Sequence, residues 1–196
     1  MRSVTLTVGG IPIGEGVTWA YPKGIDLGRF LIPIYRLTVS GTACTGVPVT
    51  KIFQVFRFGV QSEDGKTARV VGLAEEQTHT IQGWIPDYSV HSREDCQAMV
   101  SSPECPDHGA WRVMKGKGFL VHAGPPNPFD RIRPCATIGC IEVIGINEFI
   151  HLNNLLIDLM GPPAGSATQK LTAIGNSGQL FIAYQSAPRP TLKVTR

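Results

Sequence analysis

The chain has 196 residues, of which 42% are hydrophobic, and its 18 Lys and Arg against 15 Asp and Glu give a net charge of +3 at pH 7. This length predicts a single domain that buries well over half of its unfolded surface without needing a metal or a disulfide. The small charge, with no run rich in Lys or Arg, argues against nucleic acid and an anionic membrane surface as partners. No apolar segment has the length of a membrane span, so we expect no membrane insertion.

The first half of the chain has the pattern of β-structure. Polar and apolar residues alternate in segments 3–8 and 51–61, and segment 30–41 is more continuously apolar. Segment 68–83 offers one or two further strands, and turn residues at 63–65 precede it. The pattern predicts a mainly β domain (α+β) whose strands are mostly antiparallel.

Segment 86–110 differs in composition and reads as an insert between strands. Ser92 can cap a short helix that runs to about Val100. The insert also contains four potential zinc ligands: His91, Cys96, Cys105 and His108. Their spacings match no common zinc finger, so no metal is expected. Cys96 and Cys105 flank a turn and could instead form a disulfide.

The second half combines short strands with one substantial helix. Residues 111–114 and 119–122 are predicted as a hairpin, and residues 140–145 as a further strand. Segment 146–160 has the periodicity of a helix, with Asn147 able to cap its start and Gly161 followed by two prolines to end it. One face of this helix collects its apolar residues: Phe149, Leu152, Leu156 and Leu159.

The end of the chain is predicted as a Gly- and Ser-rich connection, a late strand at 178–185 and a loosely held tail at 186–196. At the other end, residues 1–16 alternate polar with apolar and do not form a signal peptide. A cytoplasmic protein, a chain whose export signal has been removed and a protein exported by another route all fit this N-terminus.

A histidine and a cysteine stand out between residues 121 and 143. His122 ends an apolar run, and Cys140 follows a Thr-Ile-Gly turn. A neighbouring imidazole can take the thiol proton and stabilise the thiolate, which is the reactive form of cysteine. Gly139 permits a tight turn and a close approach to a substrate, and the N–H groups of Gly139 and Cys140 could face an oxyanion.

This arrangement resembles the catalytic motif of the L,D-transpeptidase (YkuD-type) domain, in which His is followed by a spacer, Ser/Thr-His-Gly-Cys and an apolar residue. The matching residues are His122, Thr137, Gly139, Cys140 and Ile141, with fourteen residues between the first two. The resemblance is clear over residues 111–145 and implies an L,D-transpeptidase-like β-sandwich or barrel of mixed strands, with one substantial helix after the Cys.

Two positions depart from that motif. Ile138 stands where the family has His, and Glu142 stands where Arg or Asn often follows the Cys. In this reduced form, without a signal peptide, the chain looks most like the L,D-transpeptidase-like toxins that bacteria inject by type VI secretion. The likeness implies a protein that is cytoplasmic before export and acts in the periplasm on peptidoglycan, with an immunity protein as a further partner.

The resemblance implies a ping-pong acyl transfer on peptidoglycan stem peptides, without a cofactor. Cys140 would attack the carbonyl between an L-centre and a terminal D-residue, and His122 would act as base and then as acid. Water would resolve the thioester in a carboxypeptidase, and an amine in a transpeptidase. A backbone carbonyl is the favoured group to orient His122, with Thr137 as a second candidate.

Arg131 and Arg133, between base and nucleophile, are candidates to bind a stem carboxylate, because arginine binds carboxylates through two N–H groups. Solvated loop charges explain these two residues equally well. Cys135 is interpreted as a core thiol or as the partner of a distant cysteine such as Cys44. Because Ile138 and Glu142 depart from the motif, the alternative function is a catalytically inactive domain of this fold that binds a cell-wall peptide, a glycan or a protein.

Overall fold

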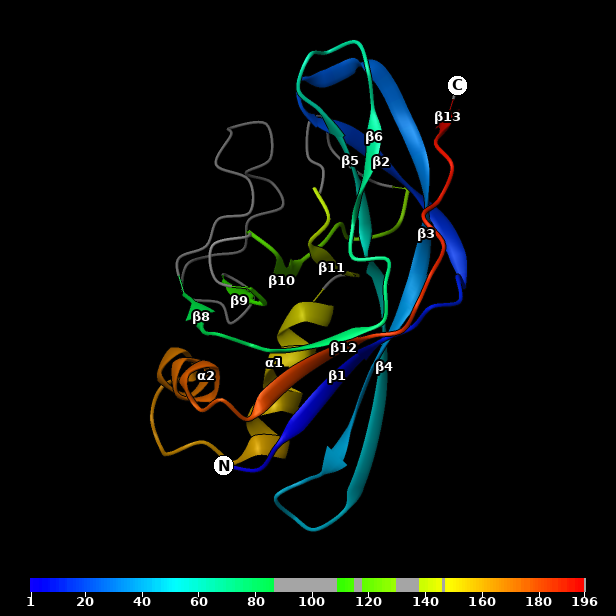
Figure 1. Cartoon of the computed structure of the whole chain (residues 1–196). Coiled ribbons are helices and arrows are strands. Elements are labelled where there is room, and N and C mark those ends of the chain that lie inside the picture. Colours follow the sequence, from blue (N-terminus) through cyan, green and yellow to red (C-terminus); the bar gives the residue numbers. More distant parts are fainter. Residues whose placement is uncertain (87–108, 115–117, 130–137, 146, 196) are drawn as a thin grey trace.

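The computed structural model describes residues 1–86, 109–114, 118–129, 138–145 and 147–195 (Figure 1). Over these residues the chain forms a mainly β fold with two helices, which confirms the predicted fold class. The strands are β1 (Val4–Val8), β2 (Gly14–Pro22), β3 (Gly24–Thr42), β4 (Pro48–Phe56), β5 (Phe58–Ser62), β6 (Arg69–Gly72), β7 (Gln77–Thr80), β8 (Trp84–Ile85), β9 (Ala110–Arg112), β10 (Leu120–Ala123), β11 (Ile141–Ile144), β12 (Leu180–Tyr184) and β13 (Lys193–Thr195). The helices are α1 (Glu148–Met160) and α2 (Ala167–Asn176).

The described strands belong to one sheet, whose main path runs β6-β5-β2-β3-β4-β11-β10-β9-β8. The long strand β3 joins most of it, because β3 pairs with β1, β2, β4 and β13. Most pairs are antiparallel, as predicted, whereas β1–β12, β2–β5 and β10–β11 are parallel. The sheet is therefore mixed.

Alternation of apolar residues decides which face of each strand is buried. Val4, Leu6 and Val8 of β1 are buried in the main core, while Thr5 between them is exposed. Because successive side chains of a strand point to opposite faces, this pattern buries one face of β1 against the helices. The strands predicted at 3–8 and 51–61 are confirmed in this way, the latter as β4 and β5.

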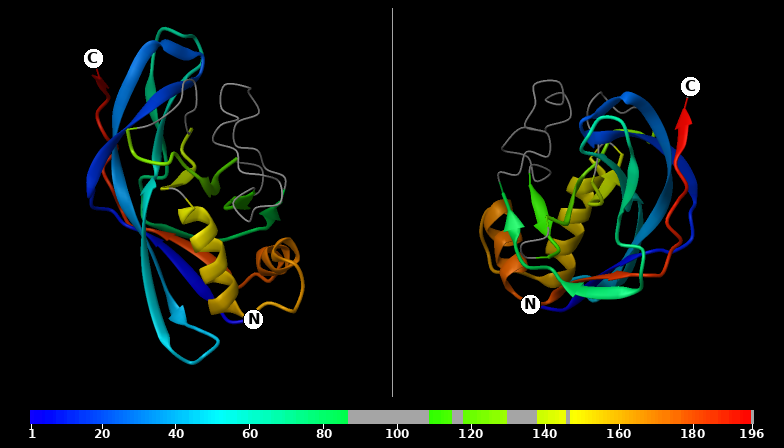
Figure 2. Two further views of the ribbon diagram at one scale, coloured as in Figure 1. Left: turned by 180° about the vertical axis from the view of Figure 1, so that it is seen from behind. Right: turned by 45° about the horizontal axis from the view of Figure 1, so that its top comes forward.

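Helix α1 packs against β1, β10, β11 and α2 and fills the main core (Figure 2). The predicted apolar face is buried as expected: Phe149, Leu152, Leu156 and Leu159. Each such side chain contributes roughly 1.5–3 kcal/mol to folding. Gly161 ends the helix at φ 62, with its N–H donated to the Ile157 carbonyl, as predicted.

The start of α1 differs from the prediction. Asn147 occupies the N-cap position, but its side chain makes no capping hydrogen bond. Its φ of 62 places it in the left-handed region, whereas a side chain that caps a helix usually comes from an extended residue. The prediction that the Asn147 side chain caps the helix is therefore wrong, although the helix does start after Asn147.

Helix α2 lies in the segment that composition predicted to be an irregular connection. Ser166 and Gln169 form a capping box, in which each side chain accepts a hydrogen bond from the backbone N–H of the other. The Ser-x-x-Gln spacing is a sequence signal for this start, but neighbouring Gly and Pro residues obscured it. The helix packs on β8, where a Cβ at Gly175 would lie 2.5 Å from the backbone nitrogen of Trp84.

The last residues of the chain are held more firmly than predicted. Strand β13 pairs with residues 29–31 of β3, and the Ala187 N–H donates to the Ala74 carbonyl over 2.8 Å. The two termini lie at opposite ends of the molecule (Figure 1). Most of the insert predicted at 86–110, with its helix and its potential zinc ligands, lies outside the described residues. Neither α1 nor α2 has the length and apolar character needed to cross a membrane.

Candidate active site

The predicted hairpin exists and carries His122. Strands β9 and β10 are antiparallel, with Trp111 opposite Val121, and the Val113 N–H donates to the Phe119 carbonyl over 2.9 Å. The Trp111 indole N–H donates to Asn153 Oδ1 of α1, also over 2.9 Å, and both side chains are fully buried. This bond anchors one face of the hairpin to the helix.

The opposite face of the sheet at this point carries both the candidate base and the candidate nucleophile. Strands β10 and β11 run parallel, with His122 opposite Glu142 and Val121 opposite Ile141. Cys140 directly precedes β11, so continuing this register places it opposite Leu120. Because side chains alternate, His122 and Cys140 are diagonal neighbours on one face, and strand spacing puts their Cα atoms roughly 8 Å apart. Cys140 packs with Ala110 and Leu120, which confirms the face.

His122 is buried, with 2% of its surface exposed, and its ring is oriented by the backbone. Nδ1 lies 2.8 Å from the carbonyl oxygen of Ala123. Since a carbonyl only accepts, Nδ1 carries the proton, and the lone pair of the neutral ring is on Nε2. The predicted orientation by a backbone carbonyl is thus observed, and it leaves Nε2 as the basic nitrogen.

Cys140 retains 7% of its surface exposed. Its Sγ lies 3.5 Å from the Gly118 carbonyl oxygen, to which the thiol donates. This contact belongs to the neutral thiol, because a thiolate cannot donate and would be repelled by the carbonyl. The thiol must turn away from Gly118 before its proton can pass to a base.

Gly139 forms the expected tight turn, but the group that approaches it closely belongs to the protein and not to a substrate. Its φ is 103, and a Cβ at this position would lie 2.9 Å from both Cα and N of Gly72, at the end of β6. Gly72 also has a positive φ, of 137. Two glycine backbones therefore pack together directly beside the candidate nucleophile.

A buried arginine holds the segment that follows Gly72. Arg57 is fully buried, and its guanidinium donates to the carbonyl oxygens of Gly9, Gln185 and Leu73. Within the described part of the chain it forms no ion pair, and its Nε has no hydrogen-bond partner. Three aromatic rings lie within 5.5 Å of its Cζ atom: those of Tyr35, Phe58 and Tyr184.

The charges in this region act on one another through a largely apolar interior. Burial lowers the pKa of Arg57, and the coulombic interactions with Tyr35 and Tyr184 oppose that fall. Burial also raises the pKa of Tyr184 well above its usual range. The Arg57 cation lowers that pKa, and the negative charge of a Cys140 thiolate raises it, so Tyr184 lies within electrostatic reach of both residues.

The two residues that depart from the family motif differ in their exposure to solvent. Ile138 is 44% exposed, so an apolar side chain faces solvent two residues before the candidate nucleophile. Glu142 is fully buried on the same face as His122. A glutamate carries no positive charge, so Glu142 does not replace the cation that the family often carries at this position.

Other predicted site residues lie outside the described residues, namely Thr137, Arg131, Arg133 and Cys135. Their predicted roles therefore remain predictions. Cys44, the suggested partner of Cys135, is a free exposed thiol that donates to Asp158 Oδ1 over 2.8 Å. This hydrogen bond and the carboxylate charge raise the pKa of Cys44.

One exposed cation on the same face as Cys140 escaped the sequence reasoning. Arg112 follows the buried Trp111 in β9, and the alternation of buried and exposed residues was its only signal. Only the register of β9, β10 and β11 shows that Arg112 shares a face with Cys140.

No family model, curated protein or solved structure matches this chain. The likeness to L,D-transpeptidases therefore depends on the residues of the motif alone.

Proposed function

We propose that the chain is a cysteine acyl-transfer enzyme of the L,D-transpeptidase type, acting on peptidoglycan stem peptides as a carboxypeptidase, a transpeptidase or both. One observation carries the proposal: His122 and Cys140 occupy one face of adjacent parallel strands, and the Ala123 carbonyl holds the imidazole with Nε2 as its basic nitrogen. Thiol activation by a histidine requires the two side chains to come within hydrogen-bonding reach, and neighbouring positions on one face allow that approach.

In the proposed reaction, Nε2 of His122 takes the proton from Cys140 Sγ. The thiolate then forms a bond to the carbonyl carbon of the L-centre, and the carbonyl π electrons move to oxygen. Collapse of this intermediate breaks the C–N bond, and the imidazolium gives its proton to the leaving amine. Water or an acceptor amine attacks the thioester in the second half, with His122 again acting as base.

We also propose that this enzyme is an antibacterial toxin that acts in the periplasm and is neutralised by an immunity protein. The support is the reduced Thr-x-Gly-Cys-Ile motif. Expression in a bacterial host tests it: the chain should inhibit growth when a leader directs it to the periplasm and not when it stays in the cytoplasm.

Activity is tested by incubating the protein with stem tetrapeptides and with whole sacculi and identifying products by mass spectrometry. Loss of the terminal D-residue indicates carboxypeptidase activity, and its exchange for an added D-amino acid indicates transpeptidase activity. Cys140→Ala should abolish both. Cys44→Ala is the matched control, because Cys44 is a free thiol bound to Asp158 at the far end of α1.

A second candidate is a catalytically inactive domain that binds a cell-wall peptide, and the low 7% exposure of Cys140 favours it. This candidate predicts that the wild-type chain binds stem peptides without turnover, and that Cys140→Ala binds equally well. Turnover by the wild-type protein that is lost in Cys140→Ala excludes it.

A further inference from the structure

Arg112 lies in a row of side chains that leads directly to Cys140. In the register of β9 and β10, Arg112 is opposite Leu120. The register of β10 and β11, continued by one residue, places Cys140 opposite Leu120 on the other side. The three residues therefore cross three adjacent strands on one face, and two strand spacings separate the Cα atoms of Arg112 and Cys140 by about 10 Å.

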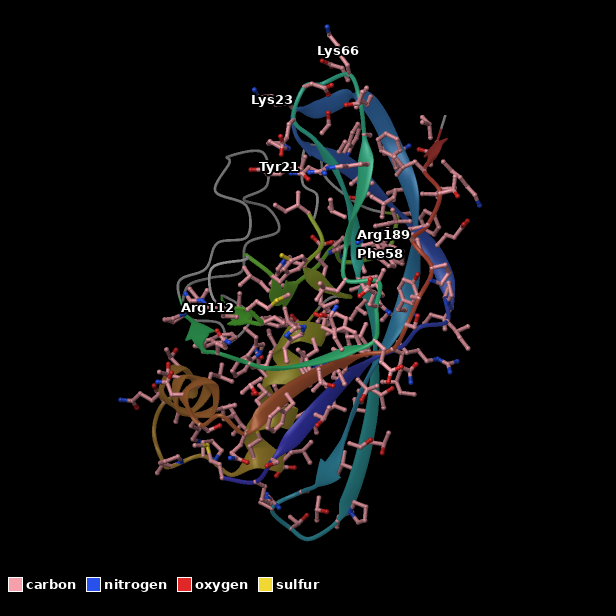
Figure 3. The ribbon with its side chains drawn as sticks, in the orientation of Figure 1. Tyr21, Lys23, Phe58, Lys66, Arg112 and Arg189 are labelled. Carbon is pink, nitrogen blue, oxygen red and sulfur yellow. The ribbon has the colours of Figure 1, made fainter. Side chains whose placement is uncertain are left out.

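Packing supports this assignment of faces. Trp111, next to Arg112, points toward Asn153 of α1, so Arg112 points away from the helix. Leu120 and Cys140 belong to one small apolar cluster on that opposite face. Figure 3 shows Arg112 at the β8–β9 side of the molecule, far from the lysines at the end of β2, β5 and β6.

The Arg112 guanidinium is available for a ligand. The residue is exposed, and its backbone pairs with Gln82 and Gly83. Among the residues that the structure describes, its side chain has neither an ion pair nor a hydrogen bond.

We propose that Arg112 is a specificity-determining residue that binds a substrate carboxylate close to the bond attacked by Cys140. This inference rests on the proposed function. Arg112 would select substrates that carry a carboxylate within about one residue of the attacked carbonyl, because consecutive Cα atoms are only about 3.8 Å apart. A guanidinium binds such a group through two parallel N–H···O bonds.

Two carboxylates of a stem peptide have this chemistry: the terminal one on the leaving residue and a side-chain one on the residue that is attacked. Glu142, which lies on the face of His122, cannot itself supply the cation for either. Of the described cations, Arg112 is the one that the strand register aligns with the nucleophile.

The test compares the wild-type protein with Arg112→Gln and Arg112→Lys on three peptides: the free acid, its C-terminal amide and its side-chain amide. Arg112→Gln should lower kcat/KM for the free acid by roughly 10- to 100-fold, as expected for a hydrogen bond between charged groups. Arg112→Lys should restore part of this loss. Arg189→Gln, which changes an exposed arginine on the segment between β12 and β13, should have no effect.

The amides identify which carboxylate is bound. The amide that removes the bound carboxylate should lower wild-type kcat/KM to the level of Arg112→Gln, and Arg112→Gln should cause no further loss on that peptide. If Arg112→Gln lowers activity equally on all three peptides, or on none, the inference is wrong.

Binding to Cys140→Ala separates this inference from the proposed function. In this background, isothermal calorimetry with the free acid should give a weaker affinity when Arg112→Gln is added. A chain without turnover whose peptide affinity still depends on Arg112 and on one carboxylate would overturn the proposed enzyme and retain the binding role of Arg112. Equal affinities with and without the substitution would overturn that role.

Discussion

Gly139 and Gly72 approach each other backbone to backbone, close enough that a Cβ on Gly139 would lie 2.9 Å from two main-chain atoms of Gly72. A Cβ on Gly72 would in turn lie 2.5 Å from the Arg57 carbonyl oxygen. The end of β6 is therefore enclosed between the turn that presents Cys140 and the backbone of Arg57. The position of the candidate nucleophile depends on this stack of main-chain segments.

Gly72→Ala should destabilise the protein by about 3 kcal/mol or more. The alanine would adopt a strained positive φ and would also overlap the Arg57 carbonyl, and each of these effects typically costs about 1–3 kcal/mol. The measurement is the free energy of unfolding in urea. Gly178→Ala is the matched control, because Gly178 has a φ of 68 but a Cβ there meets nothing within 4 Å. Equal losses in the two variants would mean that the close packing at Gly72 contributes nothing.

Thiol labelling at neutral pH tests the proposed pair directly. In the wild-type protein, mass spectrometry should find Cys140 alkylated faster than its 7% exposure alone would allow, because His122 takes the thiol proton. His122→Ala should slow labelling at position 140 by about 10-fold or more. His151→Ala should leave the rate unchanged, since His151 is exposed on α1 and pairs with Glu148. A rate at Cys140 that does not respond to His122→Ala would contradict base assistance.

The sequence predicts most elements of the fold because their apolar periodicity is regular. The strand at 3–8, the hairpin that carries His122 and the apolar face of α1 all follow from alternation or from helical spacing. Helix α2 was missed because its signal is a capping box of two polar residues within a Gly-rich segment. Strand β13 was missed because three largely exposed residues carry no apolar pattern.

For the site, the sequence identified the candidate base and nucleophile but not their surroundings. His122 and Cys140 share a motif, so local spacing was enough to propose them. Arg57 and Arg112 lie outside the motif. Only the folded structure shows that Arg57 donates to the residue after Gly72 and that Arg112 shares a face with Cys140. Register of this kind depends on tertiary packing and cannot be read from one sequence.

Asp64 should give the protein a stability that depends on acid pH. Hydrogen bonds from the Thr67 and Lys66 N–H groups and from the Thr67 hydroxyl hold the pKa of Asp64 well below its usual range. A lowered folded pKa means that this contribution is complete above the unfolded pKa of about 3.9 and declines as pH falls below it. The difference in unfolding free energy between the wild-type protein and Asp64→Asn should therefore shrink between pH 6 and pH 2.5. A constant difference would show that the ionised carboxylate is not what the turn stabilises.

Arg57→Met should cost roughly 3 kcal/mol or more in unfolding free energy. The substitution keeps much of the apolar stem but leaves the carbonyl oxygens of Gly9, Gln185 and Leu73 without their donors, and each buried, unsatisfied group costs about 1–3 kcal/mol. It also removes the cation from between the three aromatic rings. Arg57→Lys should lose less, because an ammonium keeps the charge and three donors but not the planar fork. Urea unfolding measures both variants, with Arg69→Met on the exposed edge of β6 as control. If Arg57→Met has the same unfolding free energy as the wild-type protein, the guanidinium does not support the segment at Gly72 that packs against Gly139.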